Sequence, residues 1–504
     1  MGFKSYTLGD INQYLKQRCT TLFPNREQWE FEKKNINPLP GLRSMSWRQW
    51  QFFIIGFISW TWDAFDFFVM SLNVSKLATD LDRSVKDISW GITVVLMFRS
   101  VGAIVFGYFG DRYGRKWPLI VNLFCLVVIQ IGTGFINTYA EFIGVRALFG
   151  VFMGSMYGLA SATAMEGLPT SARSFLSGVY QQGYALGYLL GVIFQRAITD
   201  TTTHTWRSLF WFSAGPPVLF IIWRACLPET EAFLQQQLHM KNKNTSFSED
   251  AYKVFKEQWL KMIYLVLLMA GMNFMSHGSQ DLYPTMLTVQ LNYSPNRSTV
   301  TNSVANLGAL AGGMTFGHFS GFLGRRSGII ICSILGACMI YPWAFVRNSG
   351  INAGVFFLQF FVQGAWGVIP IHLSELSPPE FRAFVVGVSY QLGNLASSAS
   401  STIESTLGEG YPLYDENGDV IEGVYDYARV MAIFVGAVFC YVILIAFIGP
   451  ENRHSNINYV LSKEEEEELI QQRMIVTNNG SEQDSNADDE EKLVTAHTEK
   501  IEPK

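Results

Sequence analysis

The segment from Asn273 to Thr285 places several polar side chains inside an otherwise apolar stretch. Asn273, His277, Asp281 and Thr285 recur every four residues, so a helix presents them on one face, and Gln280 follows His277 by three. Histidine titrates near neutral pH, and a carboxyl group in a medium of low dielectric keeps its proton to a higher pH than in water. The stripe therefore predicts two proton carriers flanked by hydrogen-bonding groups. The alternative is a polar stripe that only joins neighbouring helices.

Three more groups of polar residues interrupt apolar sequence. Arg99 follows VVLMF, Asp63 and Asp66 lie in WDAFD, and Gln391 and Asn394 lie in QLGN. A guanidinium stays charged and its planar fork fits a carboxylate, so Arg99 predicts an anion anchor, and the two aspartates predict further proton carriers. Two alternatives stay open. Arg99 reaches water or pairs permanently with an aspartate, and the two aspartates cap the outer end of their helix.

The elements that must position these groups are apolar segments, each near the ~20 residues with which a helix crosses a bilayer. Only 16% of the 504 residues are charged, against roughly 25% in a soluble protein, and the charges gather in 1–49, 227–261 and the tail from Glu451. A charge at the centre of a bilayer costs about 2.5–3.5 kcal/mol, so the polar groups above need a function. We expect an all-α membrane protein with twelve transmembrane helices, at 50–72, 88–109, 117–136, 139–163, 174–197, 207–226, 260–288, 301–323, 328–346, 351–371, 382–406 and 427–449.

Basic residues indicate the orientation of these helices. They fill the N-terminal segment, the 109–117 turn, the central loop and the 323–328 turn, whereas the 404–426 loop is acidic. Because basic loops stay in the cytosol, both termini are expected there. Asn292 and Asn296 then begin glycosylation sequons on the outer face, a short pattern that also arises by chance.

The same pattern divides the chain into five parts. We expect a cytosolic N-terminal segment, two six-helix halves joined by a cytosolic loop, and a disordered acidic tail, at 1–49, 50–226, 227–259, 260–449 and 450–504. The tail cannot bury a core and stays accessible to ubiquitylation and trafficking machinery, or it is an inert extension.

An internal repeat relates the two halves. GYFGDRYGRK begins at Gly107 and GHFSGFLGRR at Gly317, an offset of 210 residues, while ExxPxxxR begins at Glu166 and again at Glu375, an offset of 209. Gln182 has its counterpart in Gln391. Two pseudo-symmetric six-helix halves of this kind place a binding site at the midplane between them. The same offset relates Asn273 and Ser276 to Asp63 and Asp66, which favours one shared cavity.

The first copy of the repeat resembles the signature of the major facilitator superfamily, and Arg146-x-x-x-Gly150 is similar to its second motif. The resemblance implies a cytosolic latch that breaks and remakes as the halves rock. Asp111 accepts from a helix N-terminus, and Arg115 and Lys116 pair with acids such as Glu166. Gly321 replaces the aspartate in the second copy, which predicts a looser latch there. The expected gating residues are Gly107, Asp111, Arg112, Gly114, Arg115, Lys116, Arg146, Glu166, Arg173, Arg325, Arg326, Glu375 and Arg382.

A narrower resemblance covers the region from Trp47 to Pro450. The pattern NxxSHxSQDxxxT is similar to the signature of the fungal Jen family of carboxylate/proton symporters. It implies plasma-membrane symport of protons with short monocarboxylates or dicarboxylates. The substrate-pathway residues that it implies are Asn273, Ser276, His277, Gln280, Asp281, Thr285, Gln391 and Asn394. To these we add Arg99 from its chemistry and Gln182 from the repeat.

Other classes of protein fit the sequence less well. The six cysteines lack CxxC spacing, and no metal site, cofactor, enzymatic motif, nucleic-acid partner or cleavable leader is expected. Two rivals stay open. A membrane sensor on the same fold binds its ligand without turnover, and a facilitator of neutral solutes lines its cavity with aromatic and amide groups without Arg99.

Overall fold

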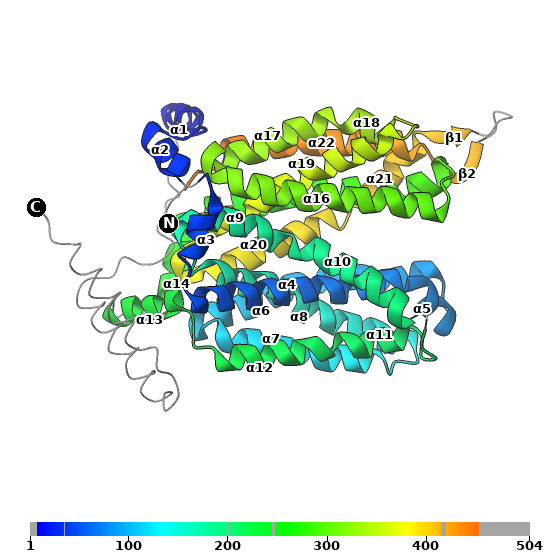
Figure 1. Ribbon diagram of the computed structural model, residues 1–504, viewed down its shortest axis with the longest axis horizontal. Coiled ribbons are helices and arrows are strands. Elements are labelled where there is room, and N and C mark those ends of the chain that lie inside the picture. The colour runs from blue at the N-terminus through cyan, green and yellow to red at the C-terminus, as the bar shows by residue number, and fades with distance from the viewer. Residues whose placement is uncertain (1–7, 35, 200, 244–246, 415–419, 453–504) are drawn as a thin grey trace, which may run out of the picture.

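Two bundles of helices lie side by side in the computed structural model, which describes residues 8–34, 36–199, 201–243, 247–414 and 420–452 (Figure 1). Both ends of the described chain lie at one end of the molecule, here called the latch end, and the strands β1 (Pro412–Tyr414) and β2 (Val420–Tyr425) lie at the other, the hairpin end. Nearly all of the predicted acidic tail is outside the described residues.

The first half spans residues 47–226 and runs back and forth between the two ends. Its helices are α4 (Trp47–Leu72), α5 (Val74–Asp80), α6 (Val85–Tyr113), α7 (Lys116–Thr133), α8 (Tyr139–Met165), α9 (Thr170–Gln181), α10 (Gly183–Phe194), η1 (Gln195–Thr199), α11 (Trp206–Ser213) and α12 (Gly215–Cys226). The long helices α4, α6 and α8 begin at serine or threonine caps. The cap hydroxyls accept from the backbone three residues on, because the N–H groups of a first turn have no partners within the helix.

The second half repeats this arrangement. Its helices are α14 (Phe247–Gln280), α15 (Tyr283–Thr285), η2 (Met286–Gln290), α16 (Pro295–Leu323), α17 (Arg325–Cys338), α18 (Ile340–Ala344), α19 (Gly350–Leu376), η3 (Pro379–Phe381), α20 (Arg382–Ser397), α21 (Ser400–Glu409) and α22 (Tyr427–Ile448). The break after Gln280 precedes Pro284, whose missing N–H and ring interrupt a helix.

Three short helices precede the first half and one joins the halves. These are α1 (Leu8–Thr20), α2 (Arg26–Lys34), α3 (Pro38–Arg43) and α13 (Glu231–Lys243). Helix α14 begins at Phe247 and not near residue 260, so the central loop is largely helical. The polar N-terminal segment and the loop therefore carry more regular structure than their composition indicated, because tertiary contacts hold them against the bundle.

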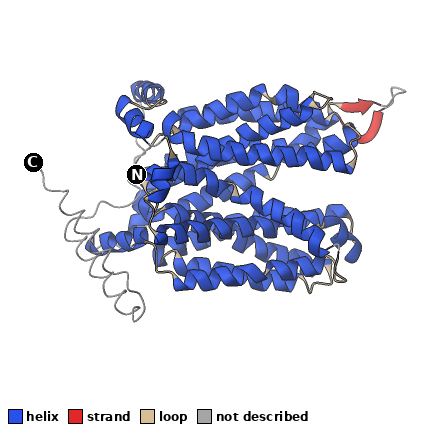
Figure 2. Ribbon diagram, in the orientation of Figure 1, coloured by secondary structure: helices blue, strands red, loops and turns tan. Residues whose placement is uncertain are grey.

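Each of the twelve predicted segments coincides with one helix or with two or three consecutive helical elements, so the all-α fold predicted from the sequence is confirmed (Figure 2). Within the described residues, eight helices are long and apolar enough to cross a membrane by length and composition. The remaining segments are interrupted, as in α9–α10, α17–α18 and α20–α21, or carry many polar residues, as in α16. Such interruptions are tolerated at membrane depth where neighbouring helices cover the freed backbone groups.

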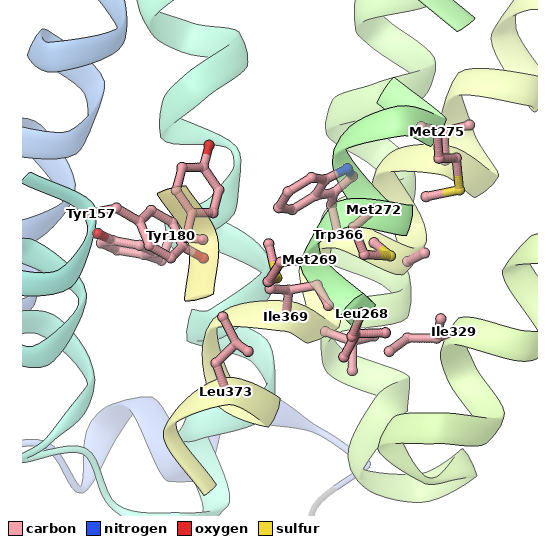
Figure 3. Packing of buried hydrophobic residues seen from close by; sticks show 14 of the residues in the cluster. Tyr157, Tyr180, Leu268, Met269, Met272, Met275, Ile329, Trp366, Ile369 and Leu373 are labelled. Atoms are coloured by element: carbon pink, nitrogen blue, oxygen red, sulfur yellow. The ribbon is translucent and has the colours of Figure 1, made fainter. Parts of the chain in front are cut away.

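The largest hydrophobic cluster joins the two halves. Figure 3 shows Tyr157 and Tyr180 from the first half facing Trp366 and Met269 from the second. Between the halves the backbones approach closely at Gly158, where an added Cβ atom would lie 2.5 Å from the carbonyl oxygen of Ala383. Small residues at such crossings permit close helix packing in a membrane protein.

Candidate functional site: the latch end and the interface between the halves

The first copy of the repeat motif forms a buried latch between the halves. Asp111 accepts hydrogen bonds from the backbone N–H groups of Ala383 at 3.1 Å and Phe384 at 2.8 Å, at the start of α20. Its carboxylate also lies 3.1 Å from Arg115, which donates to Glu166 at 2.8 Å. Because the first N–H groups of a helix have no partners within it, this terminus is a ready site for a carboxylate. Both predicted contacts, of Asp111 and of Arg115, are confirmed.

Arg115 lies in the turn between α6 and α7. Burial lowers the pKa of its guanidinium, but the carboxylates of Glu166 and Asp111 act in the opposite sense, and the net effect raises the pKa above its ordinary value. Arg115 therefore remains charged. Glu166 also lies 3.6 Å from Arg382 of the second half, so one carboxylate contacts arginines of both halves.

Of the two basic residues expected to pair with acids, Arg115 takes Glu166, and the acidic neighbour of Lys116 is Glu229. The Lys116 ammonium donates to the carbonyl of Ala225 at 2.7 Å, and its backbone N–H donates to Glu229 at 3.0 Å. Arg112 is exposed and donates to the hydroxyl of Tyr108. These side chains fasten α7 and the surface of the first half, since their partners all belong to residues 108–229.

In the second copy, Arg325 takes the place of Arg115. It donates to both oxygens of Glu375 at 3.0 Å and to the hydroxyl of Ser174, in the first half, at 2.9 Å. Arg325 thus forms a two-pronged pair although Gly321 leaves the second copy without the aspartate of the first, and the looser latch stays a prediction. Arg326 turns away from the interface and binds Glu451 and the carbonyls of Phe447 and Gly449. Arg173 donates to the carbonyl of Leu168 and lies within electrostatic range of Glu375.

Arg99 lies buried near the middle of α6. Its Nε and Nη2 atoms find no hydrogen-bond partner among the described residues, and its guanidinium lies 5.8 Å from the ring centroid of Tyr390 in the second half. It acts electrostatically on Asp63 in its own half and on His277 in the other. Within the described residues no ion pair ties it to an aspartate, so the permanent pairing that the sequence left open is not found. A buried guanidinium whose Nε and Nη2 atoms have no hydrogen-bond partner among the described residues suits a planar anion such as a carboxylate.

The two aspartates of α4 lie in different surroundings. Asp63 is buried, neither of its carboxylate oxygens has a hydrogen-bond partner among the described residues, and Arg99 is its main charged neighbour. Asp66 instead faces Arg146, Gln130 and Ser213 within the first half. Arg146 itself donates to Gln130 at 3.3 Å and to Thr133 at 2.7 Å. Asp63 therefore belongs to the interface between the halves, and Asp66 and Arg146 to a polar cluster inside the first half.

His277 and Asp281 form a contact of 2.9 Å between the imidazole Nδ1 and one carboxylate oxygen. Their side chains remain 23% and 39% exposed, in contrast to the buried Arg99. The spacing of four residues that predicted this pair is thus confirmed. Thr285 lies beyond the break after Gln280, so the helical series does not continue to it.

The other polar residues of this stripe bind within the second half. Asn273 donates to the carbonyl of Met269 in its own helix at 2.8 Å, Ser276 accepts from the indole of Trp366 at 2.6 Å, and Gln280 donates to Gln359 at 2.9 Å. Ser279 lies against Gln359 as well. The contacts of Ser276, Ser279 and Gln280 join α14 to α19, whereas that of Asn273 stays within α14.

The paired amides cross between the halves. Gln391 is buried and donates to the carbonyl of Gly154 in α8 at 3.1 Å, while Asn394 donates to the Gln391 side chain at 3.2 Å. Gln182 lies at the break between α9 and α10. Its amide occupies the space that a side chain at Gly313 of α16 would need. Each repeat therefore sends one glutamine into the opposite half.

A cluster of aromatic side chains, which sequence reasoning did not single out, lies beside Arg99. Tyr157 stacks on Tyr390 with ring centroids 4.0 Å apart, and Trp60 lies 6.0 Å from Tyr390 and 5.9 Å from Tyr184. Tyr184 is within electrostatic range of Arg99, Asp63 and Asp281. In the sequence these tyrosines stand singly in apolar helices. A tyrosine in a binding site cannot be told there from one that only packs in the core.

Glu404 is a second residue that the sequence did not single out. It was counted with the acidic 404–426 loop, yet its side chain is buried in α21, neither carboxylate oxygen has a partner among the described residues, and Asp281 is its charged neighbour. Among the described residues, no three His, Cys, Asp or Glu side chains gather as they would around a metal ion.

The comparisons with known proteins agree with this architecture. The family model described as "Sugar (and other) transporter" matches residues 39–457. The chain is 42% identical to the Saccharomyces cerevisiae protein named "Carboxylic acid transporter protein homolog" over 477 residues, which cover 90% of this chain and 76% of that protein. It is 27% identical to the Escherichia coli sialic acid transporter NanX, over 71% of this chain and 86% of that protein.

Solved structures show the same fold. The proton:xylose symporter XylE matches with a TM-score of 0.64 at 17% identity, over 79% of this chain and 94% of that chain. The human organic anion transporter MFSD10 matches with a TM-score of 0.58 at 14% identity, over 79% and 99%. The chain belongs to the sugar (and other) transporter family of the major facilitator superfamily, a class of membrane transporters and not of enzymes. Within that superfamily it is of the Jen type, as the motif around His277 indicated.

Proposed function

We propose that this protein is a plasma-membrane symporter that moves short-chain mono- or dicarboxylates together with protons by alternating access. The observation that carries the proposal is the buried guanidinium of Arg99, which has unused donors at the interface between the halves and a titratable His277–Asp281 pair within electrostatic range. The name of the yeast relative, a carboxylic acid transporter homolog, supports the same class of substrate.

The substrate carboxylate binds to Arg99 in this proposal. Two parallel N–H···O bonds from a guanidinium are stronger and more directional than a contact with an ammonium. Tyr390 and Tyr184 flank the anion, and the amides of Gln391 and Asn394 lie on the Tyr390 side. A neutral sugar gives the guanidinium no charged partner, so desolvation of Arg99 would be left without compensation.

Protons bind to His277 and Asp281, the more exposed acid–base pair of the interface. An imidazolium paired with a carboxylate is neutral as a whole, and a further proton on Asp281 leaves the imidazolium free to attract the anion. Asp63 competes with the substrate for Arg99 when ionised and releases Arg99 when protonated. Proton and carboxylate therefore bind as a set, which couples their movement.

Alternating access follows from the latch. In the described residues, hydrogen bonds between the halves gather from the latch end to the middle of the bundle, at Asp111, Ser177, Arg325 and Gln391. We infer a form that is closed on the cytosolic side, with both termini in the cytosol and the exposed Asn292 and Asn296 available for glycosylation outside.

Uptake of labelled substrate tests this proposal. The chain is expressed in cells that lack their own carboxylate carriers, and uptake of labelled lactate and of labelled succinate is measured at pH 5 and pH 7, with unlabelled lactate, pyruvate, succinate, malate or glucose as competitors. We expect faster uptake at the lower pH and competition by carboxylates only. Uptake that glucose inhibits and pH does not change indicates a facilitator of neutral solutes, and binding without uptake indicates a sensor.

A further inference from the structure

The two copies of the latch differ in where their carboxylate comes from. In the first copy, Asp111 lies on α6 itself and binds the start of α20 in the other half. The equivalent position in the second copy, 210 residues later, is Gly321 on α16. The position that corresponds to Phe384 is Ser174, the fifth residue of α9. A side chain is thus missing at the point where α16 faces the other half.

The carboxylate of Glu32 fills that point. A Cβ atom added to Gly321 would lie 2.8 Å from Oε1, 2.9 Å from Cδ and 2.9 Å from Oε2 of Glu32. Glu32 belongs to α2 in the N-terminal segment, far from Gly321 in the sequence, and it is partly buried there. The whole carboxyl group therefore occupies the volume that an aspartate at position 321 would use.

Helix α2 is held at this place by contacts on both sides of Glu32. The ring of Trp29 lies 4.8 Å from that of Phe322, and the imidazole of His318 lies 2.9 Å from the carbonyl of Ile36. Further along, Gly41 of α3 packs so closely on Ser171 at the start of α9 that an added Cβ atom would lie 2.8 Å from its hydroxyl. The N-terminal segment thus lies across both halves at the latch end, as Figure 1 shows for α1, α2 and α3.

Arg325 is the charged group on which Glu32 acts. The carboxylate of Glu32 interacts electrostatically with Arg325, together with Glu375 and Glu451. Arg325 in turn donates to Ser174 in α9 at 2.9 Å. In the first copy, the carboxylate of Asp111 lies 3.1 Å from Arg115. A helix that only packed on the surface would need Trp29 but would leave a glutamate in water, because burying a carboxylate beside a glycine backbone is costly without a cationic neighbour.

We propose that Glu32 is a positioning residue that supplies, from the N-terminal segment, the carboxylate that the second latch lacks. It acts through Arg325, which binds α9 of the opposite half. The first latch carries its acid on a transmembrane helix and keeps it through the cycle. The second carries its acid on a short helix that is able to leave, so docking of α2 favours the form closed at the latch end. The proposal adds a residue to the transport cycle and rests on the proposed function only for its transport readout.

Relocation of the carboxylate tests the proposal. Four variants of the full chain are purified and compared with wild type: Glu32→Ala, Glu32→Gln, the double variant Glu32→Ala with Gly321→Asp, and the matched control Glu30→Ala, whose side chain is exposed on the same helix. Amide hydrogen exchange without substrate is followed in residues 320–326 and in the first turn of α9. Because an interaction with a charged group is lost, we expect about tenfold faster exchange in both single Glu32 variants. The double variant should exchange at the wild-type rate, because its new aspartate restores the carboxylate from α16.

The outcomes separate a latch carboxylate from simple packing. If Glu32→Gln, which keeps shape and loses charge, exchanges like wild type, the proposal is overturned. It is also overturned if Glu32→Ala behaves like Glu30→Ala. Should the double variant fail to fold, as shown by its melting temperature, the comparison of the alanine and glutamine variants still decides. Exchange is measured without substrate, so a negative uptake result with carboxylates contradicts the proposed function and leaves this test intact.

Discussion

The two halves of this transporter share a repeat but differ in how exposed their charged side chains are at the interface between them. The first half provides Arg99 and Asp63, each 2% exposed, and the second provides His277 and Asp281, whose side chains are 23% and 39% exposed. A permanent charge thus lies buried, and a titratable pair lies within reach of water. In the proposed function, the buried Arg99 of the first half binds the anion and the more exposed pair of the second half exchanges protons with water.

The repeat itself does not preserve this chemistry. With the offset of 210 residues, Arg99 corresponds to Ala309, His277 to Phe67 and Asp281 to Ser71. Three features recur in both halves: close helix crossings at glycine, an arginine–glutamate pair, and a glutamine amide that reaches the opposite half. All three are packing contacts. The two halves therefore share their packing contacts, whereas the groups that the proposed function assigns to anion and proton binding lie in one half only.

The largest effect is expected from removal of the proton-exchanging charge. Asp281→Asn should abolish accumulation of carboxylate against its gradient, because the amide cannot take up a proton, yet leave exchange of internal for external substrate. The measurement is a comparison of proton-driven uptake with counterflow in proteoliposomes. Asp82→Asn is the matched control, since Asp82 is exposed and asparagine tolerates its φ of 49°. Normal accumulation by Asp281→Asn would remove the second half from proton coupling.

A smaller effect is expected when Arg99 is replaced by a residue that keeps the positive charge but lacks the planar guanidinium. Arg99→Lys should raise the KM for carboxylate about 10- to 100-fold, since the second hydrogen bond of the fork is lost, with a smaller change in the maximal rate. Arg83→Lys is the control, because Arg83 is exposed and lies over the Tyr139 ring, a contact that lysine also makes. An unchanged KM would make Arg99 a structural residue.

The smallest effect is expected where the second half touches the anchor. Tyr390→Phe keeps the ring that stacks on Tyr157 but removes the hydroxyl that interacts with Arg99 and Asn394. A neutral hydrogen bond contributes roughly 0.5–1.5 kcal/mol, so the KM should rise about two- to tenfold. Initial rates of uptake over a range of substrate concentrations give this value, with Tyr341→Phe, an exposed tyrosine, as control. A loss as large as that of Arg99→Lys would contradict this ranking and mean that the Tyr390 hydroxyl contributes as much to substrate binding as the fork of Arg99.

Much of this arrangement was predictable from the sequence, because it depends on local spacing. Apolar length defines the spans, the interval of four residues joins His277 to Asp281, and the repeat locates the latch. The direction in which Asp66 points was not predictable. Helix α4 is apolar on most of its surface, so no periodic pattern sets its rotation, and contacts with Arg146 and Gln130 from other helices decide it.

The remaining surprises are contacts between segments far apart in the chain. Glu32 lies against Gly321. Glu404 was expected in the acidic loop but is buried near Asp281. Neither neighbour is visible from local composition, because each depends on how a short helix folds back onto the bundle.

The most direct test of the central claim is movement of protons with the substrate. Purified protein is reconstituted into liposomes that contain a pH-sensitive dye, succinate is added outside at equal starting pH, and the lumenal pH is recorded. The account predicts acidification of the lumen in step with succinate entry, absent from protein-free liposomes and from liposomes with Asp281→Asn. Succinate entry through the wild-type protein without any change in lumenal pH would contradict proton-coupled carboxylate symport.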